Sequence, residues 1–109
     1  MKQYLDKHQT AKLIELGFEK PKNEKWVLDI VNENTPSIQN IVKRQDYSIG
    51  ELLSFLPLTI QWTPRVIRCN VIEYSFETEG SELYYCNAHN ELIDNLFDMC
   101  VKLKEIGEI

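Results

Sequence analysis

The residues best suited to chemistry are a cysteine and a histidine three positions apart. Cys86 and His89 offer a thiolate and an imidazole, and both groups bind Zn²⁺. A structural zinc site draws four ligands from clustered spacings, whereas this pair is at most half a site and His8 lies far away in the sequence. We therefore expect no metal and no other cofactor. The cysteines are expected to be buried free thiols, and His89 to be exposed in the first turn of the last helix.

Paired carboxylates are the second type of candidate, because two of them can serve as general acid and general base. Glu73 lies close to Glu77, and Glu91 lies close to Asp94. Such pairs are common on solvated faces, and we expect Glu73 and Glu77 to face water. No serine lies in a nucleophile elbow, and the four glycines are isolated rather than grouped into a phosphate-binding loop. The sequence therefore predicts no catalytic residue and no enzymatic activity.

Aromatic and basic residues in the second half suggest a surface for single-stranded nucleic acid. The aromatic candidates are Trp62, Tyr74, Tyr84 and Tyr85. A stacking platform also needs surrounding basic residues. Only Arg65 and Arg68 lie nearby, and a nucleic-acid contact would also use Lys43 and Arg44 from the first half. Because they are few, an aromatic core or a protein interface is the favoured interpretation, and nucleic-acid contact through these four residues is the alternative.

The charge distribution also argues against nucleic acid as a partner. Residues 1–50 carry eight Lys/Arg and seven Asp/Glu, whereas residues 51–109 carry four and ten, and the net charge is −5. Sequence-independent binding of nucleic acid relies on neutralising phosphates with Lys and Arg. The excess of Asp and Glu in the second half therefore disfavours binding to the negatively charged phosphates.

Length and composition are those of one globular domain over residues 1–109. The chain has 109 residues, of which 43% are hydrophobic and 27% are charged. No apolar run approaches the roughly 18 residues that a membrane-spanning helix needs. The N-terminus lacks the continuous apolar segment of a secretory signal. We therefore expect a cytoplasmic protein with no membrane contact.

Two helices are predicted from their caps. Asp6 followed by Gln9, and Ser48 followed by Glu51, both fit a capping box, in which two residues satisfy each other's backbone N–H groups. These pairs predict helices near residues 6–16 and 49–56. Gly17 then closes the first helix, because glycine adopts the left-handed conformation that ends helices.

A third, amphipathic helix is expected over residues 88–105, with Asn87 or Asn90 as its cap. Its apolar residues recur at steps of three and four and form a broad stripe that covers one face of the sheet. Val101 and part of the Met99 side chain lie outside a single stripe. Such surplus apolar surface favours a dimer contact.

The strands are predicted from alternation of apolar residues. Residues 26–31 fit a strand, whereas the segment IQNIV, residues 38–42, fits either a short strand or irregular chain. Residues 58–86 fit a β-hairpin with a turn around Gly80. Its apolar residues change parity near Val71, which indicates either a bulge there or a strand covered on both faces.

Three motifs carry a resemblance to known proteins. They are an N-terminal helix that ends as LIELGF, the segment YSIGELLSFLP, and a final helix that runs from ELID into KLKE. In these motifs the chain resembles small uncharacterised proteins encoded on prophages and conjugative elements of gut anaerobic bacteria. That family has no assigned activity, so the resemblance implies a fold and a mobile-element origin rather than a reaction.

Together these patterns predict an α+β fold: a small antiparallel sheet with a β-hairpin, covered by an N-terminal helix, a short middle helix and a C-terminal amphipathic helix. The expected function is that of a non-enzymatic accessory protein of a mobile element, which acts through contact with a protein partner and also forms a homodimer. The expected interface residues are Trp62, Tyr74, Tyr84, Met99 and Val101. A nucleic-acid-associated regulator of the element is the alternative, and an enzyme with a pocket between sheet and last helix is a third hypothesis.

Overall fold

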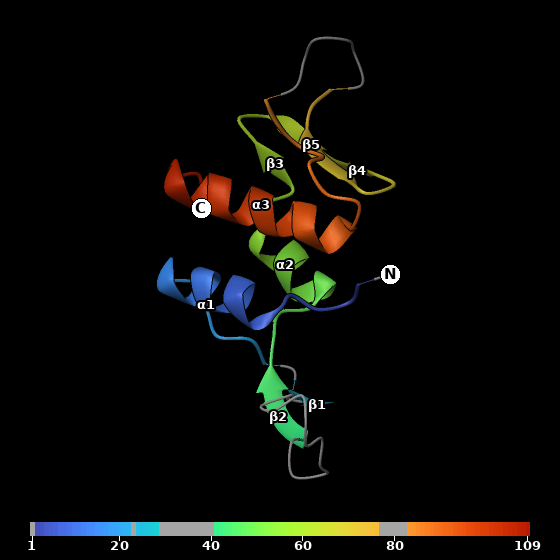
Figure 1. Cartoon of the computed structure of the whole chain (residues 1–109). Helices are drawn as coiled ribbons and strands as arrows, with labels where there is room; N and C mark the ends of the chain where they lie inside the picture. Colours follow the sequence, from blue (N-terminus) through green and yellow to red (C-terminus); the bar gives the residue numbers. More distant parts are fainter. Residues whose placement is uncertain (1, 23, 29–40, 77–82) are drawn as a thin grey trace.

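In the residues that the structure describes, the fold combines three helices with a four-stranded antiparallel sheet, which confirms the predicted α+β class (Figure 1). The computed structural model describes residues 2–22, 24–28, 41–76 and 83–109, and it describes residues 25–28 and 41–44 by their backbone alone. The helix α3 (Leu92–Glu105) lies between the sheet and the other two helices. None of the described helices is long and apolar enough to cross a membrane.

Both predicted capping boxes are present. At α1 (Lys7–Glu15), the Asp6 carboxylate accepts the N–H of Gln9 at 2.8 Å, and the Gln9 side chain accepts the N–H of Asp6 at 3.1 Å. At α2 (Ile49–Phe55), Ser48 and Glu51 make the reciprocal pair, each at 3.2 Å. Gly17 ends α1 with a φ of 99°, which a residue with a Cβ rarely adopts. Local residue types therefore determine where these helices begin and where α1 ends.

The four-stranded sheet has the order β3-β4-β5-β6, and all its neighbours are antiparallel. Its strands are β3 (Thr59–Ile60), β4 (Thr63–Arg68), β5 (Val71–Tyr74) and β6 (Tyr84–Cys86). The predicted turn around Gly80 lies outside the described residues. The sequence predicts one arm of the hairpin over residues 58–76, interrupted at Pro64. The chain instead reverses twice there, through the two-residue turns 61–62 and 69–70. The second reversal explains the change of parity near Val71 that suggested a bulge.

Helix α3 forms the centre of the core. One side of it contacts β5 and β6, and the other side contacts α2 and α1 (Figure 1). Burial of apolar side chains is the main favourable contribution to folding, at about 1.5–3 kcal/mol for each large one. The fully buried apolar side chains come from α1, α2, α3, β5 and the segments before α1 and α2: Leu5, Leu13, Tyr47, Leu52, Ile72, Tyr74, Ile93, Leu96, Met99, Cys100 and Leu103.

Two polar contacts connect the sheet to the end of α2. The Arg65 guanidinium donates from Nη1 to the carbonyl oxygens of Leu53 and Leu56, both at 3.0 Å. A cation at this position complements the helix dipole, and it adds a second donor to the Leu53 carbonyl, which also accepts the Leu56 N–H. The buried Tyr74 hydroxyl donates to the Pro57 carbonyl at 2.5 Å, and burial raises the pKa of Tyr74 to about 12. Both side chains therefore have a role within the fold.

A separate two-stranded sheet consists of β1 (Glu24–Leu28) and β2 (Ile41–Gln45). It projects from the side of the molecule opposite the four-stranded sheet (Figure 1). The strand predicted at residues 26–31 begins two residues earlier, and residues 29–31 lie outside the described residues. The end of the segment IQNIV belongs to β2, while residues 38–40 also lie outside the description.

Candidate contact site on the last helix

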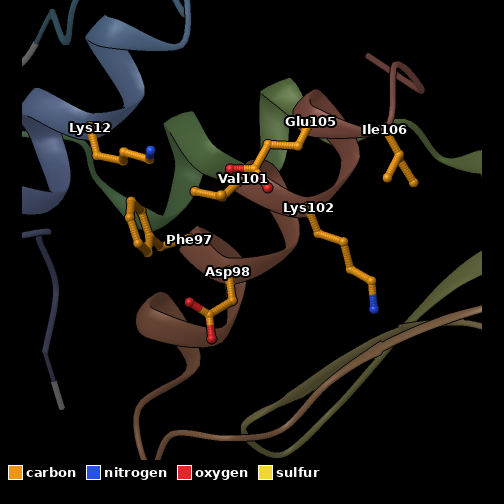
Figure 2. A pocket seen from close by; sticks show the side chains of 7 residues that line it. All are labelled: Lys12, Phe97, Asp98, Val101, Lys102, Glu105 and Ile106. Atoms are coloured by element: carbon orange, nitrogen blue, oxygen red, sulfur yellow. The ribbon is translucent and has the colours of Figure 1, made fainter.

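A groove of about 430 Å³ runs along the exposed side of α3 beside α1. Figure 2 shows Lys12 reaching from α1 toward the α3 residues that form the rest of the lining. These residues are Phe97, Asp98, Val101, Lys102, Glu105 and Ile106. The groove therefore belongs to two elements that are distant in sequence and meet only in the folded chain.

The apolar floor of the groove follows from the width of the α3 stripe. Buried residues recur along α3 at steps of three and four, at Ile93, Leu96, Cys100 and Leu103. Phe97 and Val101 each lie next to a member of that stripe, so they pack against the core while remaining half-exposed. The prediction that Val101 lies outside the buried stripe agrees with its position in the groove.

Four charged residues surround this floor, two of each sign. Asp98 pairs with His89, with 2.9 Å between the carboxylate and Nε2, and the Lys102 ammonium lies 5.7 Å from the centre of the Tyr84 ring. Among the described residues, the side chains of Lys12 and Glu105 have no hydrogen bond or ion pair. The rim therefore offers both a donor and an acceptor to an incoming group.

Neither of the two buried thiols, Cys86 and Cys100, is suited to nucleophilic chemistry. Burial raises the pKa of the Cys100 thiol to about 12 and also raises that of Cys86, whereas a reactive cysteine needs a lowered pKa. The thiols of both residues remain protonated at neutral pH. Cys69 is exposed, contrary to the prediction that all three cysteines are buried.

The structure separates the predicted interface residues into two groups. Tyr74 and Met99 are fully buried, so the prediction that they form an interface is wrong. Tyr74 lies on the sheet face that α3 covers, and Met99 lies on the inner side of α3. Trp62 is 92% exposed, and Val101 and Tyr84 are half-exposed. These three residues remain available for contact.

The predicted nucleic-acid residues do not form a described cluster. Arg65 donates to carbonyls at the end of α2, which engages the guanidinium inside the protein. Arg68 is exposed at the end of β4. Lys43 and Arg44 lie in β2 on the separate two-stranded sheet, and the positions of their side chains lie outside the description.

The other sequence candidates for chemistry also have identified environments. His89 is exposed as expected, but it precedes α3, which begins at Leu92 rather than near residue 88. Neither Asn87 nor Asn90 caps α3, because Glu91 is at the cap position and makes no side-chain cap bond. Glu73 is only 8% exposed, contrary to the expectation that it faces water, and Glu77 lies outside the described residues. Across the described residues, no group of three or more His, Cys, Asp or Glu could hold a metal ion.

A polar network that the sequence did not indicate joins the N-terminal segment to α1 and α3. The Lys2 ammonium donates to Asp94 at 2.7 Å and to Gln9 at 3.0 Å, and the Gln9 amide donates to Asp94 at 2.8 Å. The Lys2 backbone N–H donates to Glu91 at 3.0 Å. Burial acts to raise the pKa of Asp94, but these hydrogen bonds and the charge of Lys2 outweigh it and hold the pKa below its ordinary value of 3.8.

We expect Lys2→Met to lower the free energy of unfolding by about 1 kcal/mol near pH 6, because it removes the partly exposed Lys2–Asp94 ion pair. The folded pKa of Asp94 is depressed, so this stabilisation is present above pH 3.8 and is lost as the pH falls through the lower folded pKa. Urea unfolding at several pH values measures both effects. Lys7→Met is the control, because Lys7 is exposed at the start of α1. An equal loss for the two variants at pH 6 would contradict the role of Lys2.

The turn between β3 and β4 is the other unusual feature near α3. Its two central residues, Gln61 and Trp62, have φ values of 50° and 67°, which are left-handed values that bulky residues rarely adopt. On each side of the turn, Ile60 and Thr63 are buried. The Gln61 amide donates to Glu108 at 3.2 Å. The turn is therefore held beside the C-terminal end of α3 with the indole of Trp62 in solvent.

Fold and groove define a small α+β domain with a surface suited to contact. Comparison with protein-family models, curated proteins and solved structures gives no match to this chain. The function must therefore be argued from the groove and its surroundings.

Proposed function

We propose that the protein is a non-enzymatic accessory protein that acts through protein–protein contact at the α1–α3 groove. The observation that carries this proposal is the apolar floor of Phe97 and Val101, half-exposed between charged residues. An apolar centre with a polar rim is the usual composition of a protein interface. The resemblance in the capping and helix motifs supports the further proposal that the protein serves a mobile genetic element in the cytoplasm.

The dimensions of the groove suit one or two large apolar side chains from a partner. Helix-in-groove recognition places such side chains along a channel between helices. Burying one of them contributes about 1.5–3 kcal/mol, and association costs at least about 4 kcal/mol in lost rigid-body freedom. A stable complex therefore requires that the partner bury more than one large apolar side chain, or that it bury one and also make polar contacts to Lys12 and Glu105.

The chemical character of the groove favours binding over catalysis. Its charged groups, Lys12, Asp98, Lys102 and Glu105, lie along a rim rather than around an enclosed centre. The raised pKa values of Cys86 and Cys100 disfavour nucleophilic attack by either thiol. A binding role requires only the shape and polarity that are present.

An affinity pull-down of the tagged full chain from native host lysate, with and without nuclease, tests this proposal. We expect Val101→Glu to reduce recovery of a specific partner at least about tenfold, because it places a carboxylate on the apolar floor. Ile14→Glu is the matched control, because Ile14 is an exposed residue of α1 that does not line the groove. Recovery by wild type and Ile14→Glu should not depend on nuclease.

Two outcomes would contradict the proposal. A partner recovered equally by Val101→Glu and wild type does not use the groove. Loss of partners on nuclease treatment would support the alternative of a nucleic-acid-associated regulator.

A further inference from the structure

Trp62 has a left-handed backbone conformation that bulky residues rarely adopt, and its side chain lies in solvent. It is 92% exposed, and both central residues of its turn have left-handed φ values. Each such residue costs on the order of 1–2 kcal/mol, so glycine or asparagine usually occupies these positions in two-residue hairpins. The buried neighbours Ile60 and Thr63 and the Gln61–Glu108 bond hold the turn in place. The result is a large aromatic side chain on a preorganised support.

Trp62 and the groove lie near the same end of α3. The turn is tied through Gln61 to Glu108, just beyond the helix, and the groove extends to Ile106. One chain therefore carries a projecting aromatic group and an apolar groove close together. In a dimer with a twofold axis, the same surface of both copies forms the interface. Trp62 of each copy can then enter the groove of the other copy.

The chemistry of the groove matches an indole. Phe97 and Val101 offer apolar and aromatic contact, and the ammonium groups of Lys12 and Lys102 are suited to the face of a tryptophan ring. The carboxylates of Asp98 and Glu105 are acceptors for the indole N–H. The volume of about 430 Å³ is ample for one indole with its neighbouring atoms.

Charge also favours a second copy as the occupant. The net charge of −5 would oppose association if acidic residues met at the contact. The rim instead carries two cations and two anions, Lys12, Lys102, Asp98 and Glu105, so two grooves can approach without a net like-charge repulsion. A dimer buries two tryptophan side chains, one from each copy. Burial of one side chain alone would not offset the free-energy cost of association.

The geometry points to a homodimer in which Trp62 of each copy occupies the α1–α3 groove of the other. This inference rests on the proposed function of the groove as a contact site and names its occupant as a second copy of the chain.

Light scattering on the full chain across about 1–300 µM tests the dimer, a range set by the affinity expected of two such anchors. We expect wild type to dimerise, and Trp62→Gly and Val101→Glu each to raise the dissociation constant at least about tenfold, since anchor residues dominate interface energetics. Glycine adopts the positive φ of position 62 without strain, so Trp62→Gly removes the indole and should not destabilise the turn. Ile14→Glu is the matched control and should dimerise like wild type.

Fluorescence of a Trp26→Phe variant follows Trp62 alone, because the chain has two tryptophans. Its emission should shift to shorter wavelength as the protein concentration rises and the indole leaves water. A wild-type chain that stays monomeric throughout, or a dimer that persists in Trp62→Gly, would overturn the inference. If the chain is monomeric but Val101→Glu still loses its partner in the pull-down, the inference fails and the proposed function stands. If the dimer forms as expected and all lysate partners bind Val101→Glu, the groove serves self-association alone.

Discussion

Replacing Asn95 with alanine is expected to lower the free energy of unfolding by about 3 kcal/mol. Asn95 is fully buried at the start of α3. Its Oδ1 accepts the His89 N–H at 3.0 Å, and its Nδ2 donates to the carbonyls of Asn70 at 2.5 Å and His89 at 3.0 Å. Alanine would leave these three backbone groups without that partner. Their hydrogen bonds are partly buried, so each loss should cost about 1 kcal/mol, the low end of the range for a buried group.

Urea unfolding measures this loss, which is large beside a total stability of about 5–15 kcal/mol for a domain of this kind. The control is Asn87→Ala, because Asn87 is exposed and its side chain donates one long hydrogen bond to the Tyr85 hydroxyl at 3.3 Å. Asn87→Ala should change stability by less than about 0.5 kcal/mol. Similar values for the two variants would show that the Asn95 hydrogen bonds contribute little.

The second large effect is expected from Met99→Ala, which should cost about 2–5 kcal/mol. The Met99 side chain is fully buried on the inner side of α3, so its removal loses apolar burial and leaves a cavity. Val101 lies on the same helix but is half-exposed in the groove. Val101→Ala should therefore cost less than about 1 kcal/mol.

Thermal unfolding of the two variants in parallel distinguishes core from surface. At about 4–8 °C per kcal/mol for a small domain, Met99→Ala should lower Tm by at least about 8 °C, and Val101→Ala should lower it by only a few degrees. The proteins should be compared at a concentration where both are monomeric, because dimerisation itself raises Tm. The reverse order would contradict the assignment of Met99 to the core.

Features set by neighbouring residues could be predicted from the sequence. The capping boxes of α1 and α2 depend on residues three positions apart, and both are present. The closure of α1 by Gly17 depends on one residue with freedom of φ. The apolar stripe of α3 likewise depends only on helical spacing. These local rules are sufficient for α1, α2, the stripe of α3 and the α+β class, but not for the start of α3.

The two short turns of the sheet could not be predicted, because neither contains a residue pair that is typical of such turns. Gln61, Trp62 and Cys69 all have positive φ values, whereas such turns are recognised from Asn-Gly or Gly-containing pairs. The backbone there is imposed by the strands on each side. The sequence alone therefore indicates a strand through Trp62, and it indicates either a bulge or a strand covered on both faces near Val71.

The polar contacts of the last helix were missed for a different reason. Lys2 and Asp94 are 92 positions apart, and the Asn95 amide contacts the β4–β5 turn 25 positions away. Nothing local to these residues indicates such partners. The groove was predicted only in part: Val101 was identified from its position beside the stripe, but Lys12 belongs to the groove because α1 contacts α3 in the folded chain.

The lengths of the outer strands limit how molecules of this protein can aggregate. Of the described strands at the two edges of the sheet, β3 has two residues and β6 has three. Edge strands so short offer few backbone N–H and C=O groups for pairing with another chain, which is one way in which natural proteins avoid strand-to-strand aggregation and amyloid growth. The four-stranded sheet therefore offers little backbone for open-ended strand pairing, and association through it is left to side chains, which can form closed assemblies.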